Sequence, residues 1–388
     1  MTFDPAGATQ AYLDTLDPEA LAMARDYTTG NHLLILGGLA VSALVTWLIV
    51  RSHVLDKLAL RMEKRSTALR TFAIGAVYLL ISALLTLPWN IYTGWWREIQ
   101  FDRTSQPFGD FLSQGAVEVV LVAIIGAIFL TGVYGLIRRT GKNWWIWSGG
   151  LVAGALAFFL LLSPMLIEPL FNDYEPIPEG EVRDAVLALG ADAGVPEGRV
   201  FMFDGSRQSN NFTANVSGVG SNARIAISDV AISEASLDEV KAVTGHEIGH
   251  YALGHVWRAI AVYALIAIAL FWLTARTYPF FARVFRSTAT LEEVRGVPVF
   301  VFVAGLYIVL AQPAMNAVVR AGEREADIYS LETVGLPDAL AGALIKTAEY
   351  RYPRASALEE ALFYTHPTIE DRIRAAMEWK AEQEGAAE

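Results

Sequence analysis

Residues 246–275 read HEIGHYALGHVWRAIAVYALIAIALFWLTA, so a pair of histidines with a glutamate between them stands shortly before a long apolar segment. His246 and His250 are four residues apart, which places both imidazoles on one face of a helix, where they can bind one ion. Glu247 lies beside that ion and can take a proton from water that the metal has activated. The stretch therefore predicts a metal-binding helix close to a membrane-spanning one.

The start and the length of this helix are also predicted. Ser236 and Glu239 fit the S-x-x-E capping box, and no proline occurs between Ser236 and Ala275. One continuous helix over these residues would be roughly 60 Å long. It would carry the metal site near its start, about 10–20 Å from the apolar segment, and would cross a membrane at its end.

The composition indicates a membrane protein. Hydrophobic residues make up 54% of the 388 residues and charged residues only 18%, whereas soluble domains have about 25% charged residues. The net charge is −11 and no basic run occurs, so a nucleic-acid partner is excluded because phosphate binding needs clustered cations. The chain has no cysteine, so any metal ligands must be histidines and carboxylates.

Six segments are long and apolar enough to cross a bilayer, which needs about 20 residues of helix. They are residues 32–50, 71–91, 114–137, 143–167, 257–275 and 297–317. Residues 1–31 form a polar N-terminal segment without the features of a cleaved signal peptide. We therefore expect an α-helical multi-pass membrane protein with about six spans, although one or two of the segments could be buried helices of a soluble region.

Between the fourth and fifth segments the chain becomes polar. Residues 180–195 have helical spacing, and residues 199–204 and 223–229 alternate as strands do. Residues 206–222, rich in Asn, Ser and Gly, predict a loop or an irregular edge strand. The expected organisation is transmembrane helices over 32–171, a membrane-proximal α/β domain over 172–380 that includes the last two spans, and a disordered tail over 381–388.

A catalytic zinc ion usually has three protein ligands and a water, so a third ligand is expected. His255 is the nearest histidine, but its spacing does not fit the metzincin pattern, and we expect it at the helix surface or an interface. Glu323 and Asp327 share one helical face, so Glu323 can bind the metal while Asp327 holds a ligating imidazole. Taken alone, such a charged string is usually a solvated helix start. Glu325 lies roughly 200° around the helix from Glu323 and is not expected to take part.

Together these motifs resemble the integral-membrane CAAX prenyl protease type I family of gluzincin metallopeptidases. The sequence HEIGH is followed by two apolar spans, by EREAD at 323–327 and by YTHPTIEDR at 364–372. Upstream, LPWNIYTGWW (87–96), EPLFNDYEPIPEGEVRDAV (168–186) and GSRQSNNF (205–212) are similar to segments of that family. The resemblance covers residues from about 70 to 375 in one order.

The resemblance implies a zinc metalloprotease domain with one Zn²⁺ per chain. The zinc ligands would be His246, His250 and Glu323, and Glu247 would be the catalytic base and proton shuttle. Asp327 would be the carboxylate behind a ligating histidine. The membrane helices would form a ring around a large water-filled chamber, with the zinc site capping it.

The resemblance also implies a peptide or protein substrate, with or without an attached lipid, and membrane lipid as a second partner. Asn210 would bind the substrate backbone. His366 and Arg372 would contact substrate and stabilise the oxyanion, since a positioned imidazole or guanidinium stabilises developing negative charge. The chain departs from the family pattern at Asn211 and at residues 213–214, where relatives carry small apolar and aromatic residues.

Two other interpretations remain open from the sequence. An HtpX-type quality-control protease of the membrane would share the chemistry, but such chains have fewer spans before the metal-binding helix than the four here. A transporter or scaffold with a vestigial metal site would not need Glu247 for binding, and Glu247 is present.

The orientation in the membrane is predicted in two opposite ways. The loops 51–70, 138–142 and 276–296 are rich in Lys and Arg and share one side if there are six spans. Short basic loops stay in the cytoplasm, which would place both termini and the α/β domain outside it. The family resemblance implies the opposite, because its eukaryotic members face the zinc domain to the cytosol.

Overall fold

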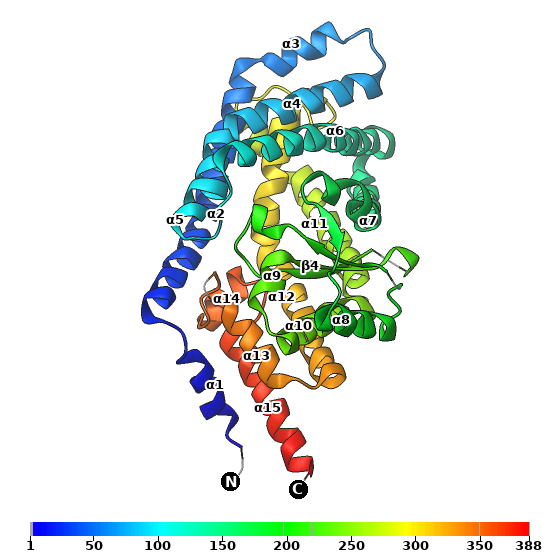
Figure 1. Ribbon diagram of the computed structural model, residues 1–388. Helices are drawn as coiled ribbons and strands as arrows, with labels where there is room; N and C mark the ends of the chain where they lie inside the picture. The colour runs from blue at the N-terminus through cyan, green and yellow to red at the C-terminus, as the bar shows by residue number, and fades with distance from the viewer. Residues whose placement is uncertain (1–2, 197, 219, 349, 388) are drawn as a thin grey trace.

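The computed structural model describes residues 3–387 apart from 197, 219 and 349. Long apolar helices lie at one end of the molecule, and a small sheet with shorter helices lies at the other (Figure 1). Both chain termini lie at the end that carries the sheet (Figure 1).

The N-terminal part is almost entirely helical. Its α-helices are α1 (Pro5–Leu13), α2 (Pro18–Ser52), α3 (Val54–Arg61), α4 (Thr67–Ile91), α5 (Arg97–Gln100), α6 (Phe108–Thr140) and α7 (Trp144–Leu162). Single π-helical turns, η1 (Tyr92–Trp96) and η3 (Ser163–Ile167), extend α4 and α7, and the 3-10 turns are η2 (Gly141–Asn143) and η4 (Glu168–Leu170). Such π turns accommodate local distortion within a helix; one follows Pro88 and the other contains Pro164.

The second part contains the sheet and two further long helices. Its strands are β1 (Tyr174–Pro176), β2 (Val200–Phe203), β3 (Ala214–Ser217) and β4 (Arg224–Ser228). Its α-helices are α8 (Glu181–Asp192), α9 (Asp229–Glu234), α10 (Leu237–Ala252), α11 (His255–Val284), α12 (Val297–Val334), α13 (Pro337–Lys346), α14 (Ala357–Phe363) and α15 (Ile369–Ala387). The short turns are η5 (Gly205–Arg207), η6 (Gly220–Asn222) and η7 (Val294–Gly296).

Five helical segments of the described chain are long and apolar enough to cross a membrane. They are Pro18–Ser52, Thr67–Gln100, Phe108–Leu170, His255–Val284 and Val294–Val334. The third segment holds both α6 and α7, which the η2 turn separates. The six expected spans therefore correspond to α2, α4, α6, α7, α11 and α12, and the multi-pass helical fold is confirmed.

These six helices form a closed ring. Each contacts the next in the order α2, α4, α6, α7, α11 and α12, and α12 returns to contact α2. In the apolar stretch of α11 only 6% of residues are buried, and in that of α2 only 17%. Helices of a solid bundle would bury at least one face, so these low buried fractions fit helices arranged in a ring.

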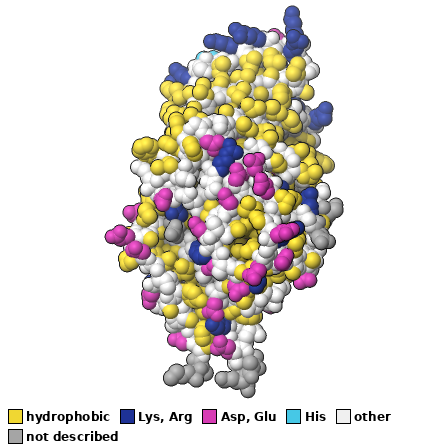
Figure 2. All heavy atoms as spheres, in the orientation of Figure 1, with side chains coloured by type: hydrophobic (Ala, Val, Ile, Leu, Met, Phe, Trp, Pro, Cys, Tyr) yellow, Lys and Arg dark blue, Asp and Glu magenta, His cyan; other side chains and the backbone are white. Residues whose placement is uncertain are grey.

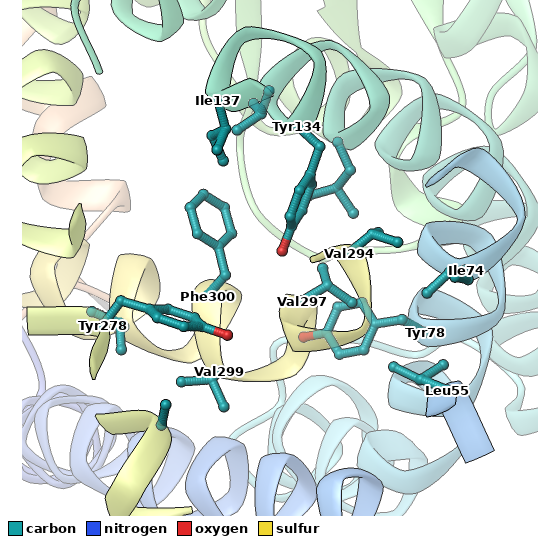
Figure 3. Close-up of a cluster of buried hydrophobic side chains, with 14 of the residues drawn as sticks. Leu55, Ile74, Tyr78, Tyr134, Ile137, Tyr278, Val294, Val297, Val299 and Phe300 are labelled. Atoms are coloured by element: carbon teal, nitrogen blue, oxygen red, sulfur yellow. The ribbon is translucent and has the colours of Figure 1, made fainter. Parts of the chain in front are cut away.

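A buried cluster closes the ring at the end away from the sheet. All six spanning helices contribute to it, and Figure 3 shows Tyr134, Tyr278 and Phe300 among its side chains. The Tyr278 hydroxyl donates a hydrogen bond to the carbonyl of Ala289 at 3.2 Å, which satisfies this buried polar group. The loop between α11 and α12 is thereby fixed against the helices, and the cluster fills the space between them at this end.

The four-stranded sheet has the order β1-β2-β4-β3. The two central strands are parallel, with Val200 opposite Ile225, and both outer strands are antiparallel to their neighbours. The predicted strands at 199–204 and 223–229 are thus β2 and β4, and the predicted helix at 180–195 is α8. Residues 206–222 are irregular except for η5, η6 and β3, which forms one edge of the sheet. Residue 219 lies outside the described chain.

The prediction of one continuous helix from Ser236 to Ala275 is wrong. The capping box is present, because Ser236 accepts from the backbone of Glu239 and Glu239 accepts from that of Ser236. However, α10 ends at Ala252 and α11 starts at His255, because Gly254 adopts a left-handed backbone conformation with φ of 65°. Such a residue ends a helix at little steric cost.

The C-terminal tail, which was expected to be disordered, is helical as far as residue 387. Helix α15 continues through residues 381–387, where alanine and glutamate are strong helix formers. The composition alone suggested disorder, but the helix that begins at Ile369 packs against α13 and α1 and simply continues.

Candidate active site

Two glycines let α10 approach α12 closely. A Cβ atom at Gly249 would lie 3.1 Å from the Cα of Ala326 and 3.1 Å from the Cβ of Tyr329. A Cβ atom at Gly245 would lie 2.5 Å from a methyl group of Val334. Larger residues would therefore push the two helices apart. The close contact matters because the histidine pair lies on α10 and Glu323 lies on α12.

His246, His250 and Glu323 converge between these helices. The two Nε2 atoms are 3.2 Å apart, and they lie 3.4 Å and 3.3 Å from the two oxygens of Glu323. Ligand atoms about 2.0–2.1 Å from one tetrahedral ion are roughly 3.3 Å apart, so the spacing fits a metal ion. In addition, Oε2 of Glu323 is buried and has no hydrogen-bond partner among the described residues, as a ligand atom would be.

Asp327 and Arg372 hold the first of these histidines. Oδ1 of Asp327 lies 2.9 Å from Nδ1 of His246, the nitrogen that does not face Glu323. Arg372 donates to both oxygens of Asp327, at 2.6 Å and 2.8 Å. The pairing with Asp327 raises the pKa of the Arg372 guanidinium despite its burial. This arrangement fixes the orientation of the His246 ring, as expected for a carboxylate behind a metal-binding histidine.

Glu247 follows His246 on α10 and is also close to this cluster. It lines the cavity beside His246, and within the described residues it forms no hydrogen bond or ion pair. Burial raises the pKa of its carboxyl group above the ordinary value, although the neighbouring histidines oppose this effect. A raised pKa makes a carboxylate a better proton acceptor. The position and the chemistry both suit a general base.

The cavity has a volume of about 340 Å³ and is formed by α10, α12, α13, the segment before β3 and the C-terminal part of the chain. Its walls are Asn211, Phe212, Thr213, Ala214, Val243, His246, Glu247, Glu323, Leu340, Ala343, Leu344, Thr347, Tyr350, Arg351, His366 and Arg372. The metal-ligand cluster therefore faces a space that can hold part of a peptide.

His366 reaches the cluster from a loop that α12 anchors. Arg320 donates to the carbonyl of Glu360, and Asn316 donates to that of Leu362, which fixes the chain just before this loop. Nε2 of His366 lies 3.3 Å from Oε2 of Glu323. Burial and the nearby positive charge of Arg351 lower the pKa of His366 to about 3, so its imidazole is neutral at physiological pH.

The structure does not bring Asn210 to this cavity. Its backbone N–H donates to the carbonyl of Arg103, and its side-chain amide donates to the carbonyl of Asp102. The next residue, Asn211, lines the cavity, and in the part of the chain that the structure describes no group donates a hydrogen bond to its buried side-chain oxygen. The expectation named Asn210, but the hydrogen bonds of Asn210 to the 102–103 segment leave Asn211, and not Asn210, in the cavity wall.

His255 and Glu325 contact each other beside the cluster, and the burial of His255 corrects the expectation that it lies at the helix surface. His255 is buried, not at the helix surface, and its Nδ1 lies 2.9 Å from Nδ1 of His250. Its Nε2 lies 2.9 Å from a carboxylate oxygen of Glu325. The sequence could not predict these contacts, because they depend on the break at Gly254 that redirects the chain after α10.

Comparison with known proteins agrees with this geometry. Residues 176–380, more than half of the chain, match the family described as "Peptidase family M48". The chain belongs to peptidase family M48. Residues 6–173 match the family described as "CAAX prenyl protease N-terminal, five membrane helices".

Similar M48 proteins cover most of the chain. The "Uncharacterized metalloprotease YhfN" of Bacillus subtilis is 26% identical over 368 residues, which are 93% of this chain and 86% of that protein. "CAAX prenyl protease 1" of Saccharomyces cerevisiae is 25% identical over 360 residues, which are 87% of this chain and 76% of the yeast protein. The crystal structure of S. mikatae Ste24p has the same fold, with a TM-score of 0.72, 20% identity, and coverage of 96% and 95%.

As an M48 member with membrane-length helices, this chain is a multi-pass membrane metalloendopeptidase that acts on peptide or protein substrates. The match over its N-terminal helices is to the CAAX prenyl protease type, which confirms the predicted family. The alternative of an HtpX-type protease explains these findings no better than the CAAX prenyl protease type does.

Proposed function

We propose that this M48 protein is a zinc-dependent endopeptidase, with His246, His250 and Glu323 as the ligands of one Zn²⁺. The observation that carries the proposal is that the Nε2 atoms of His246 and His250 lie 3.2 Å apart and 3.3–3.4 Å from the carboxylate oxygens of Glu323, beside a cavity that Glu247 also lines. Two imidazoles, a carboxylate and an open fourth position are the donor set of catalytic zinc. Family membership supports a metal, and this donor set supports zinc.

Zinc at this site would lower the pKa of a water molecule and polarise the carbonyl of the scissile bond. Glu247, in the cavity wall, would act as the general base, accepting a proton from the attacking water and returning it to the leaving amine. Asp327, held by Arg372, keeps His246 in one orientation and one tautomer. His366, which is neutral, and the cavity-facing side of Arg372 donate hydrogen bonds to the oxyanion.

The substrate binds in extended form along residues 209–214, in the part that leads into β3. This strand is an edge of the sheet and packs on α10, so a peptide can add to it by main-chain pairing. Asn211, with its unpartnered side-chain oxygen in the cavity wall, takes the backbone contact that the sequence assigned to Asn210. Asn210 fixes this segment through its hydrogen bonds to the carbonyls of Asp102 and Arg103.

The substrates are proteins or peptides at the membrane, and lipidated peptides are the first class to test. The support for lipidated substrates is the name of the relatives that are called CAAX prenyl proteases. Pairs of synthetic peptides, with and without a prenyl group, distinguish recognition of lipid from recognition of peptide alone.

The decisive experiment compares the cleavage profile of the wild type with that of Glu247→Gln on a mixture of peptides. We expect the variant to retain its metal, because the ligands are intact, and to lose about 10²- to 10⁴-fold in turnover. Glu332→Gln, at an exposed position of α12, is the matched control and should behave as the wild type. Full metal content with unchanged turnover in Glu247→Gln would contradict the proposed mechanism.

A further inference from the structure

A chain of contacts leads from the second histidine of the cluster to the surface. Nδ1 of His250 lies 2.9 Å from Nδ1 of His255, and Nε2 of His255 lies 2.9 Å from Oε2 of Glu325. Arg258 donates to both oxygens of Glu325, at 3.0 Å and 2.9 Å. The chain therefore starts at a proposed metal ligand and ends at an ion pair on the edge of the molecule.

The direction of each hydrogen bond follows from the position of His250. Its Nε2 faces Glu323 and His246, so this nitrogen must present a lone pair if it binds the metal. Nδ1 then carries the proton and donates to Nδ1 of His255. His255 consequently has its own proton on Nε2, which donates to Glu325. One arrangement of protons satisfies every contact.

The fold makes room for His255 in two independent ways. The left-handed turn at Gly254 starts α11 at His255 and directs its ring back towards α10. Gly322, on α12, lies opposite: a Cβ atom there would be 3.3 Å from Nδ1 of His255 and 3.4 Å from a guanidinium nitrogen of Arg258. A larger residue at this position would press on both side chains.

We propose that His255 and Glu325 are positioning residues that fix the tautomer and the orientation of His250, as Asp327 and Arg372 do for His246. The inference rests on the proposed function, because it requires His250 to be a metal ligand. Each ligating histidine then has its own support, one from the buried Asp327 and one from a partly exposed carboxylate. Partners of this kind typically change metal affinity by about 10- to 100-fold.

The test is the metal affinity of the purified full-length protein, measured by competition with a coloured chelator for Zn²⁺. His255→Ala and Glu325→Ala should weaken the affinity about 10- to 100-fold. Glu325→Gln keeps an acceptor for the N–H of His255 and should stay close to the wild type. Glu323→Ala should lose the metal, and Glu332→Ala, on the exposed side of the same helix, should have no effect.

A general loss of folding would not imitate this pattern. The Glu325 side chain is 44% exposed, so its variants should keep the thermal midpoint, and the difference between Glu325→Ala and Glu325→Gln isolates the acceptor. With Co²⁺ in place of zinc, His255→Asn should also change the visible absorption spectrum. Unchanged affinity in both alanine variants, with loss in Glu323→Ala, would overturn the positioning role alone. A wild type that binds no metal would overturn the proposed function as well.

Discussion

Glu247 and His366 face the same cavity, but their surroundings change their proton affinities in opposite directions. Burial raises the pKa of the Glu247 carboxyl, while burial and the charge of Arg351 lower the pKa of His366 to about 3. The first group is therefore placed to accept a proton, and the second stays neutral and can donate a hydrogen bond. The sequence indicated both residues but not these protonation states, which depend on packing.

The pH dependence of the activity follows from this difference. Glu247 can act as a base only when it is ionised, and its raised pKa keeps it protonated up to a higher pH than an exposed glutamate, whose pKa is about 4.3. We expect kcat/KM to rise with pH through this raised pKa, so that on acidification the activity is lost at a higher pH than for a base with the pKa of an exposed glutamate. The position of this acidic limb is measured from the pH profile of kcat/KM on a peptide substrate.

The control for this profile is His366→Gln, which keeps a hydrogen-bond donor. It should lower the activity while leaving the acidic limb in place, because the limb belongs to Glu247. Disappearance of the limb in His366→Gln would assign it to the histidine and contradict the electrostatic argument.

At the scale of elements, the contact between α10 and α12 decides whether the three ligand atoms meet. Gly249→Ala places a methyl group 3.1 Å from the backbone of Ala326, and overpacking of this kind costs about 1–3 kcal/mol. We expect a lower thermal midpoint together with weaker metal binding, since the helix that carries Glu323 must move away. Gly305 lies on α12 with open space around it, so Gly305→Ala should change neither the thermal midpoint nor the metal affinity.

Elements with a strong local signal were predicted from the sequence. The capping box at Ser236, the strands β2 and β4 and the apolar spans all have patterns within a few residues, and all are present. The break at Gly254 was missed, because a single glycine is tolerated within a helix and only the packing of α11 shows which conformation it adopts. The contacts of His255 and Glu325 were missed for the same reason.

At the scale of the whole molecule, charge separates along the long axis. Figure 2 shows Lys and Arg side chains gathered at the end of the molecule that is away from the sheet. Asp and Glu side chains lie mostly over the α/β domain. The expectation that the three basic loops share one side agrees with this view. The ring order of the helices, by contrast, depends on contacts between distant segments and could not be derived from the pattern of any one span.

The charge distribution predicts that the basic loops lie in the cytoplasm and the metal site outside it. Single cysteines at Ser66 and Ser233 test this prediction, since the protein has no cysteine of its own and both positions are exposed. In intact cells, a membrane-impermeant thiol reagent should label the Ser233 position and not the Ser66 position. The reverse labelling would show the orientation that the eukaryotic relatives imply.

Helix α12 also fixes the depth of the reaction in the bilayer. Its 38 residues carry both a membrane span and Glu323, and Glu323 lies about 9 Å beyond the end of the apolar stretch at residue 317. At this distance from the apolar stretch, Glu323 is expected near the lipid headgroups, and in a vesicle that contains anionic lipids the surface potential there is roughly −30 mV. Such a potential attracts protons and lowers the local pH by about half a unit. The acidic limb of the same enzyme should therefore move to higher bulk pH when neutral vesicles are replaced by anionic ones, and high salt should reverse the shift.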